Sequence, residues 1–568
     1  MGKKGLWSGY SPRFLLGLLA GWAVLLWALY VSVPKKHPEI TVFYVQLQDR
    51  WLLLTLGAVW SVAGLVCWRW RRMRAMDLPH WLPMALAGVM FALAWAGHYG
   101  VLAGHDLSRD EQMVSFDAAI YRSGRLAQSI PPAWQADIDR LNTVFMMPLA
   151  HPVAWVSTYL PGNAMLHALL GSATGPLALA VSVLALWGVA RRLLPADKEA
   201  QAVALGLFAL SGQALYAAMS NFAMPLHLAA NLVWLWLFLR DERRADVAAI
   251  VVGMVATGLH QPLFHPMFVA PWLALLLADK RWGRLALYGL AYGAIGAFWL
   301  WWPHVTLGLV SGPDSKVVSS GATYLSRLMD ALSDSQDNGP QMAANLLRMA
   351  TWTHPALFLL ALLGALAAKV DRRVAALAAG VLLPLLVMGV ILPYQGHGFG
   401  YRYLHQALGN LALLGGYGWL RLGGWRPRLR SGLLALSAGS LLALLPMQGW
   451  FAHRLYGAFA QASDKIDTAA ADYVVIGQFD APLALDLAFN RANLSNRPLR
   501  LMEENYDDLL PIMPRLCAHG ETIALPRRSF YFGIGHALHM MPGYTTEKRL
   551  AWHRREWGKA GCRVIDLY

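Results

Sequence analysis

The sequence predicts an α-helical polytopic membrane protein with about 13 transmembrane helices and a small C-terminal α/β domain. Of its 568 residues, 57% are hydrophobic and only 14% are charged. Apolar runs of about twenty residues recur, and at about 1.5 Å per helical residue each is long enough to cross a bilayer core. After about residue 450, short apolar segments separated by polar stretches replace these runs. These features exclude a soluble multidomain enzyme.

The apolar runs divide the chain into three parts. They are an N-terminal pair of helices (1–79), a main membrane module (80–446) and a C-terminal external domain (447–568). The first run is too long for the apolar region of a signal peptide and lacks a small-residue cleavage site. We place the spans, with ends accurate to several residues, at 13–33, 51–68, 80–103, 174–193, 200–218, 225–239, 247–260, 264–279, 285–303, 354–369, 374–392, 404–420 and 431–446.

The positive charge predicts orientation and not nucleic-acid binding. The net charge is +15, from 48 Lys and Arg against 33 Asp and Glu, and the basic residues cluster between spans. Short basic loops mark the cytoplasmic side of a membrane protein. Lys35 and Lys36 are the exception among the short loops. The clusters that share one side are Lys3/Lys4, Arg69–Arg74, Arg191/Arg192, Arg240–Arg244, Lys280–Arg284, Lys369–Arg373 and Arg421–Arg430.

This orientation places the polar, motif-like segments together on the opposite side. They are the loop 104–173, "SNFAMPLH" (220–227), "HQPLFH" (260–265), the loop 304–353, "GHGFGYRY" (396–403) and the tail. A transporter would instead bury charged residues inside its spans. The layout favours an enzyme whose active site faces the periplasm from a bacterial inner membrane. Within the first loop, "YLPGNAMLHALLG" (159–171) is predicted to be a surface helix, because counting it as a span would reverse the later basic clusters.

The sequence of the tail predicts a separate small α/β domain. "DYVVIGQ", "ETIALP" and "RVIDLY" are typical of strands, and "APLALDLAFNRA", "YDDLLPIMPRLCA" and "TEKRLAWHRREWGKA" of amphipathic helices. Cys517 and Cys562 both lie in this domain, where they either form a disulfide or remain two buried thiols.

An acidic stretch follows the third apolar run. In "HDLSRDEQMVSFDAAIYRSGRL" (105–126), helical spacing would place Asp110, Asp117 and Tyr121 on one face. Apolar neighbours such as Met113 and Phe116 would rest on the membrane surface. The acids would cap the helix and pair with nearby arginines, or a carboxylate would act as a general base or as a ligand for a hard cation.

This stretch resembles the first external loop of GT-C glycosyltransferases, which include the protein O-mannosyltransferases and the lipid A aminoarabinose transferases. The likeness rests on the Asp-Glu pair after a long apolar helix, on "A..I..SG.L" and on "YLPGNAMLHALLG". "GFGYRYLHQALGNLALL" (398–414) is similar to the start of a late helix in several members. The resemblance covers residues 80–446. It implies that Asp110 is the catalytic base or its close helper, with Glu111 as its usual neighbour.

Two departures from the family pattern concern binding residues. An Asp is expected before Pro225, where this chain has Met224, so Asn221 or His227 would have to replace it and a bound divalent metal is in doubt. The family's Lys before paired prolines is also missing, and Tyr159 occupies this region.

Histidines and one arginine complete the candidate site. His260, His265, His397 and His405 flank external helix breaks, where each is either a structural residue or a contact for phosphate or sugar. No metal-ligand spacing links them. Arg402, beside Tyr403, would either extend its side chain to the interface or clamp a lipid phosphate with its forked donors. Lys316 and Arg327 of the loop 304–353 are further candidate phosphate contacts.

We therefore expect a glycosyltransferase that moves a sugar from a polyprenyl-phosphate donor to a glycan, lipid or protein acceptor. The absence of a nucleotide-binding glycine loop agrees with a lipid-linked donor. The alternatives are a polysaccharide ligase or polymerase of the cell envelope, a transporter, and a non-catalytic assembly subunit. Nucleic acid is not an expected partner.

Overall fold

The computed structural model describes residues 11–34, 40–70, 79–142, 145–147, 149, 152–310, 338–505, 507–540 and 546–568. The chain folds into two compact units. Unit 1 comprises residues 1–96, 172–300 and 321–449, and unit 2 comprises residues 97–171, 301–320 and 450–568. The two units do not coincide with the three expected parts of the chain, because residues 104–171 and the C-terminal tail both belong to unit 2.

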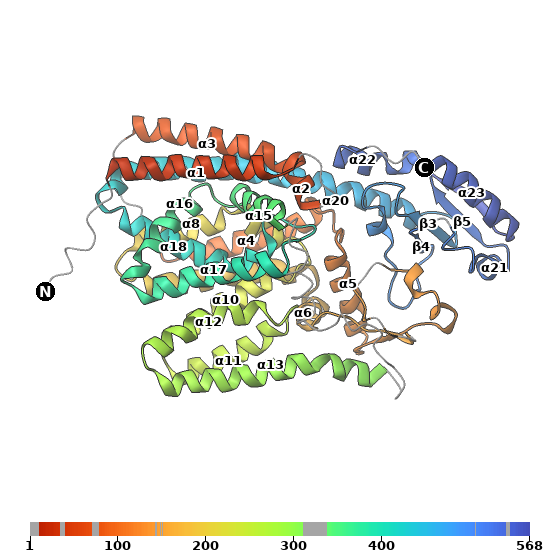
Figure 1. Cartoon of the computed structure of the whole chain (residues 1–568), viewed down its shortest axis with the longest axis horizontal. Helices are drawn as coiled ribbons and strands as arrows, with labels where there is room; N and C mark the ends of the chain where they lie inside the picture. The colour runs from red at the N-terminus through yellow and green to blue at the C-terminus, as the bar shows by residue number, and fades with distance from the viewer. Residues whose placement is uncertain are drawn as a thin grey trace. The chain divides into compact units, whose positions relative to one another are not determined.

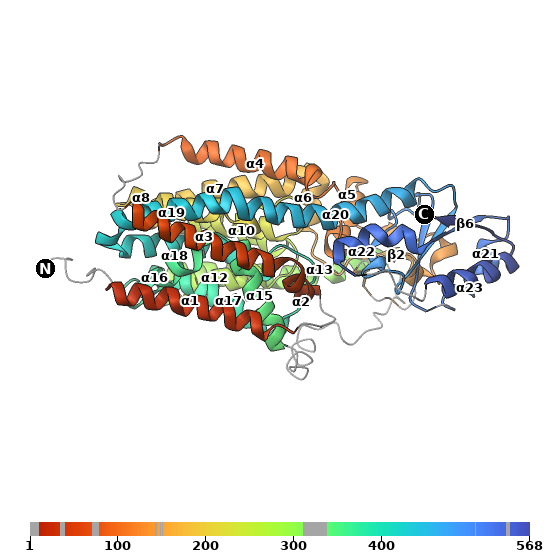
Figure 2. The same ribbon diagram turned by 90° about the horizontal axis from the view of Figure 1, so that it is seen from above.

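Unit 1 is a helical bundle whose long helices run alongside one another (Figures 1 and 2). Helices α4, α13 and α20 each have residues in both units. The helices are α1 (Pro12–Ser32), α2 (Ile40–Tyr44), α3 (Arg50–Arg69), α4 (Leu82–Gly100), α7 (Thr174–Leu193), α8 (Lys198–Ala209), α9 (Gly212–Ala217), α10 (Met224–Phe238), α11 (Arg243–Thr257), α12 (Phe264–Ala278), α13 (Trp282–Val310), α15 (Asn338–Trp352), α16 (Leu357–Ala365), α17 (Arg372–Ile391), α18 (Leu408–Arg421), α19 (Arg426–Gly439) and α20 (Leu445–Asp467).

The prediction of a polytopic helical membrane protein is confirmed, while the count of thirteen spans is not. Helices lie at all the predicted positions, but among the described residues seven are long and apolar enough to cross a membrane, or eight with the bent pair 339–352 and 357–369. Helices α10 and α12 have 15 residues each, which is short for a core about 30 Å thick. The segment 162–193 forms one candidate span, so the predicted surface helix continues into α7.

Glycine residues allow two helices of this bundle to cross with their backbones in close contact. A Cβ atom at Gly364 of α16 would lie 1.9 Å from the carbonyl oxygen of Leu414, and one at Gly418 of α18 would lie 1.9 Å from that of Leu360. Neither position can hold a side chain at this separation. Such close contact between helix backbones is a common means of association between apolar helices.

Unit 2 is an α/β domain in which the loop 104–171 contributes to the core. Its main sheet is parallel, with strand order β4-β3-β5-β6, and a small antiparallel sheet pairs β1 with β2. The elements are α5 (Arg109–Arg122), β1 (Gln128–Ser129), β2 (Ala154–Trp155), α6 (Gly162–Leu170), β3 (Tyr473–Gly477), β4 (Leu499–Glu503), α21 (Met513–Leu516), β5 (Thr522–Pro526), α22 (Phe532–Leu538), α23 (Thr546–Lys559) and β6 (Arg563–Leu567).

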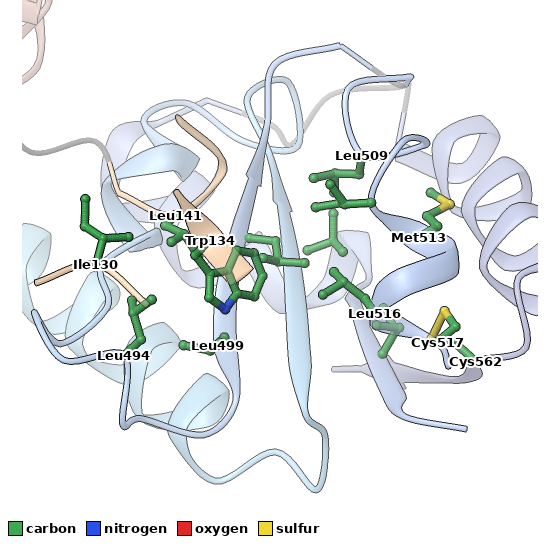
Figure 3. Packing of buried hydrophobic residues seen from close by; sticks show 14 of the residues in the cluster. Ile130, Trp134, Leu141, Leu494, Leu499, Leu509, Met513, Leu516, Cys517 and Cys562 are labelled. Carbon is green, nitrogen blue, oxygen red and sulfur yellow. A yellow bond between two sulfur atoms is a disulfide. The ribbon is translucent and has the colours of Figure 1, made fainter. Parts of the chain in front are cut away.

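The core of unit 2 contradicts the expectation that the apolar face of α5 rests on the membrane. Met113, Phe116 and Ile120 are buried in one cluster with side chains of the tail. Figure 3 shows other members of this cluster, with Trp134 from the loop beside Leu499 of β4. The apolar stripe of α5 therefore stabilises a protein domain, because burial against the sheet removes it from water.

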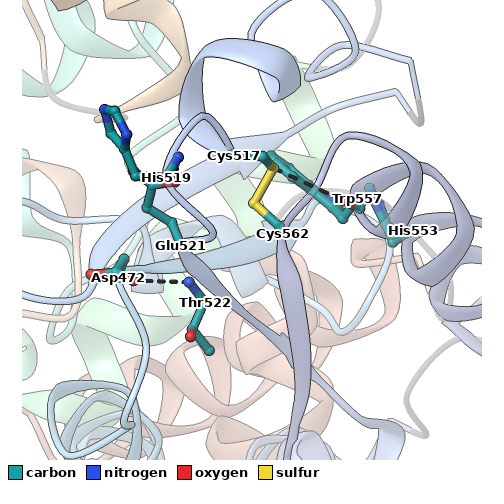
Figure 4. Close-up of a disulfide and its surroundings, with 8 residues drawn as sticks. All are labelled: Asp472, Cys517, His519, Glu521, Thr522, His553, Trp557 and Cys562. Carbon is teal, nitrogen blue, oxygen red and sulfur yellow. Dashed lines mark hydrogen bonds between the residues drawn. A yellow bond between two sulfur atoms is a disulfide. The ribbon is translucent and has the colours of Figure 1, made fainter.

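The structure of the tail agrees in part with the elements predicted from its sequence. The three predicted strands and the helix α23 are present, and of the two alternatives for Cys517 and Cys562 the structure has the disulfide (Figure 4). The predicted helix 481–492 is wrong, since only a short 3-10 turn forms there (Ala484–Leu487). The helix predicted over 506–518 is reduced to α21, where Pro511 and Pro514 oppose a longer helix.

Candidate functional site

Helix α5 begins with a capping box that uses Glu111 fully. The Ser108 hydroxyl accepts a hydrogen bond from the Glu111 amide (3.2 Å), and the Glu111 carboxylate accepts one from the Ser108 amide (3.0 Å). The Tyr456 hydroxyl also donates to this carboxylate (3.0 Å). Glu111 is 1% exposed, and burial, together with the nearby charge of Asp106, raises its pKa to about 8. These contacts give Glu111 a positioning role at the start of the helix.

Asp110, the preceding residue, lies half-buried in the same helical turn. The Tyr159 hydroxyl donates a hydrogen bond to its Oδ1 atom at 2.5 Å. Tyr159 comes from the segment before α6, so two candidate site residues far apart in the sequence meet in unit 2. The first turn of a helix favours a negative charge, which supports an ionised Asp110.

The other acids of this stretch differ from Asp110 in their surroundings. Asp117 is buried, and burial raises its pKa to about 7 against an opposing hydrogen bond from Ser157. Asp106 is half-buried and accepts a hydrogen bond from Ser115. Arg109 pairs with Asp486 of the tail. Glu111 is therefore the acid that caps the helix. Asp110 is partly exposed and accepts a hydrogen bond from the Tyr159 hydroxyl.

The raised pKa of Glu111 predicts a pH-dependent stability. Because the folded state holds this proton more tightly than the unfolded state, stability is greatest below the ordinary pKa near 4.5 and falls as the pH rises towards about 8. Glu111→Gln keeps the capping geometry and removes the titration. We expect the melting temperature of the variant to fall less between pH 5 and pH 8 than that of the wild type. If the melting temperatures of the two proteins fell by the same amount between pH 5 and pH 8, this assignment would be wrong. Asp507→Asn, which removes an exposed carboxylate, is the control.

In unit 1, two glutamines fix the backbone of the "GHGFGYRY" segment. Gln213 of α9 donates to the carbonyl oxygen of Tyr401 (2.8 Å) and accepts from its amide (3.2 Å). Gln395 accepts from the amide of Arg402 (2.8 Å). Gly400 has φ +67°, and a Cβ atom there would lie 2.2 Å from the Gln213 side chain. A glycine is therefore required here for the loop to reach its anchor.

This anchored loop presents Arg402 among aromatic rings. Its guanidinium lies 5.3 Å from the ring centre of Phe222 and 5.2 Å from that of Tyr403. Its Nη2 atom donates to the Tyr403 hydroxyl at 3.4 Å. Phe222 belongs to "SNFAMPLH", so two of the predicted polar segments meet in this unit. Asn221 lies half-buried beside it in the sequence.

A buried charged pair adjoins this loop and was not identified from the sequence. Arg348 of α15, 1% exposed, lies 3.6 Å from the carboxylate of Asp49 and donates to the carbonyl oxygen of Gly398 (2.9 Å). The Tyr44 hydroxyl contacts His397 Nδ1 at 2.6 Å, and its ring lies 4.5 Å from the Arg348 guanidinium. Asp49 belongs to the candidate span 40–69 and lies just before the predicted span 51–68. The available signal was the largely apolar sequence around each charge, just before the run 51–68 for Asp49 and within the loop 304–353 for Arg348.

Histidine 265 links three helices of unit 1. Its Nδ1 atom lies 2.7 Å from Asn231 of α10, and its Nε2 atom lies 2.7 Å from the Tyr292 hydroxyl of α13. Both ring nitrogens are thus occupied by protein groups. His260 and His405 are also buried in this unit. Lys316 and Arg327 lie outside the described residues. Within the described part of the chain, no three His, Cys, Asp or Glu side chains gather as a metal site would require.

Comparison with known proteins gives a structural likeness alone. No family model and no curated protein sequence matches the chain. Two solved structures of ArnT from Cupriavidus metallidurans match, one bound to undecaprenyl phosphate (15% identity, TM-score 0.45) and one in the apo state (14%, 0.41). Each match covers 75% of this chain and 86% of the other. At these values the match assigns no family, no residue and no activity to this chain.

Proposed function

We propose that this protein transfers a sugar from a polyprenyl-phosphate donor to an acceptor at the periplasmic face of the bacterial inner membrane. Asp110 is the general base. It takes the proton of the acceptor hydroxyl while the hydroxyl oxygen bonds to the anomeric carbon. The bond between that carbon and the phosphate oxygen breaks, and the lipid phosphate leaves with its electron pair.

The environment of Asp110 carries this proposal. A general base needs an accessible carboxylate whose orientation is fixed. Asp110 is half-buried and held by the Tyr159 hydroxyl, whereas the neighbouring Glu111 carboxylate is enclosed by its capping box. The capping box fixes the helical turn that carries Asp110, so the two adjacent acids have separate tasks.

The surroundings of Arg402 support a role in phosphate binding. A guanidinium recognises a phosphate through parallel N–H donors, and flat aromatic neighbours fix its plane. The rings of Phe222 and Tyr403 and the anchored backbone amide provide this fixation. Asn221, His260 and His397 remain predictions as further contacts to phosphate or sugar.

The disulfide supports a periplasmic location for unit 2, because disulfides persist in oxidising compartments. The basic clusters favour a cytoplasmic location for the loop after α10. In a Cys67→Ser background, we expect Ser529→Cys in unit 2 to react with an impermeant thiol reagent added to intact cells. Glu242→Cys, in that basic loop, should react only after the cells are opened. The reverse pattern would invert the orientation.

The phosphate role of Arg402 predicts a specific loss in Arg402→Lys. Lysine keeps the charge but loses the planar fork, so about 1.5–3 kcal/mol of hydrogen bonding to a charged group is lost, equivalent to about ten- to hundredfold in transfer. The melting temperature should remain near that of the wild type. Arg373→Lys, an exposed arginine in a basic cluster, is the matched control. Transfer rates in purified membranes that match the wild type would leave Arg402 with an interfacial role only.

A further inference from the structure

A polar pocket of about 540 Å³ lies wholly within unit 2 and has no part in the proposed chemistry. It opens between the chain leading into α5, the last turns of α20 and the loop before β4. Its volume falls within the roughly 300–1,000 Å³ typical of small-molecule sites. Aspartate, arginine, asparagine, glutamine, serine and histidine side chains line it, together with the phenyl ring of Phe489.

Two walls of this pocket are held rigidly. Arg500 donates from Nη2 to Asp467 (2.6 Å) and to the Ser463 hydroxyl (2.9 Å), and from Nη1 to the carbonyl oxygen of Leu487 (2.9 Å). Gln112 of α5 donates to the carbonyl oxygen of Asp486 (2.6 Å). Polar groups fixed in this way are arranged before a ligand arrives, which reduces the entropy lost on binding.

The same two side chains each keep one polar atom without a protein partner. These atoms are Gln112 Oε1, an acceptor, and Arg500 Nε, a donor, on residues that are 1% and 5% exposed. Buried polar atoms without partners are costly, so a group that supplies both a donor and an acceptor is favoured here. A hydroxyl group does both.

The charges of the lining favour a neutral ligand. Arg491, Arg497 and Arg500 are balanced by an equal number of aspartates, Asp106, Asp467 and Asp486. A polyphosphate or a polycation would meet like charges on part of this wall.

Phe489 adds an apolar face to the polar lining. Its ring is half-buried and packs at 6.2 Å against Phe116 of the core, which fixes its plane. Such a face can cover the C–H side of a sugar ring while polar groups bind its hydroxyls.

We propose that this pocket binds a neutral, polyhydroxylated saccharide and docks the glycan part of the acceptor. The acceptor role rests on the proposed transfer reaction. The binding itself needs neither donor nor catalysis, because every group invoked belongs to unit 2.

Binding can be measured on the full chain in phospholipid nanodiscs that contain no sugar detergent. The probes are the methyl glycosides of glucose, mannose and N-acetylglucosamine, detected by saturation-transfer NMR, and inorganic phosphate, detected by ³¹P line broadening. Ser495→Trp fills the pocket from an exposed lining position, and Ser529→Trp is the matched control elsewhere in unit 2. We expect at least one glycoside signal in the wild type and in Ser529→Trp, and its loss in Ser495→Trp.

A second pair of variants keeps the test decisive if Ser495→Trp does not fold. Arg491→Ala removes a lining guanidinium, and Arg555→Ala removes an exposed one outside the pocket. No glycoside signal in the wild type, an equal signal in both members of a folded pair, or binding of phosphate alone would overturn the proposal. Glycoside binding by a protein that shows no sugar transfer would instead refute the proposed function and leave the pocket assignment intact.

Discussion

We expect Asp110→Asn to lower sugar transfer by about 10²–10⁴-fold, the usual contribution of a positioned general base. Asparagine retains an oxygen that accepts the hydrogen bond from the Tyr159 hydroxyl, which the structure gives as 2.5 Å to Asp110. It cannot accept a proton at neutral pH. The variant should therefore insert, purify and bind the lipid donor, while its turnover collapses.

The matched control is Asp507→Asn, an exposed carboxylate in the same unit. It changes the net charge equally and should leave transfer unchanged. A lower melting temperature for Asp110→Asn with unaltered specific activity would make Asp110 a structural residue. Similar losses of activity in both variants would mean that charge alone matters, and the base would have to be sought elsewhere.

The apolar pattern predicted the membrane helices well because it is a local property of each segment. The positions of α10 and α12 were predicted to within one residue, but each has only 15 residues, so the number of membrane spans was harder to predict than the helices themselves. Strand β4 was missed because Arg500 and Glu503 interrupt its apolar pattern. Those charges are compatible with a buried strand only through distant partners, Asp467 for Arg500 and Arg549 for Glu503.

The predicted helix 481–492 failed for a related reason. Asn490 donates to the carbonyl oxygens of Leu141 and Arg500, and its amide binds the side chain of Asn142. These contacts with other parts of unit 2 hold an irregular loop where local spacing favours a helix. Tertiary interactions thus override local preference.

The candidate site shows the same limit. Asp110, Tyr159 and Arg402 were identified as individual residues from the sequence. The bond from Tyr159 to Asp110 and the packing of Arg402 beside Phe222 join segments that are distant in the chain. Asp49 and Arg348 were passed over because Asp49 precedes the predicted span 51–68 and Arg348 falls in the predicted loop 304–353, and the ion pair between them exists only in the fold.

The largest loss of stability is expected in Arg549→Met, which disrupts the buried charge network of unit 2. Arg549 on α23 is 2% exposed and donates to Glu503 (2.5 Å) and to both carboxylate oxygens of Asp480 (2.7 and 2.8 Å). Methionine fills much of the volume but leaves two buried carboxylates without their cation. Removing one partner from such a network typically costs about 3–5 kcal/mol of unfolding free energy.

The exposed Arg554 on the same helix provides the matched control. It pairs with Asp566 at the surface, where an ion pair is worth at most about 1 kcal/mol. Arg554→Met should therefore change stability little. The unfolding free energy of unit 2 can be measured from the urea dependence of amide exchange in β3 and β5, and equal effects of the two variants would refute the network argument.

The pH dependence of Arg549→Met separates lost charge pairing from lost packing. Burial already raises the pKa of Asp480, with Arg549 as its main opposing charge. Without that arginine the folded state should hold a proton on Asp480 more tightly than the unfolded state does. Its stability then rises as the pH falls, so the deficit relative to the wild type should be smaller at pH 5 than at pH 8. A deficit that stays constant over this range would assign the loss to packing, since a cavity does not titrate.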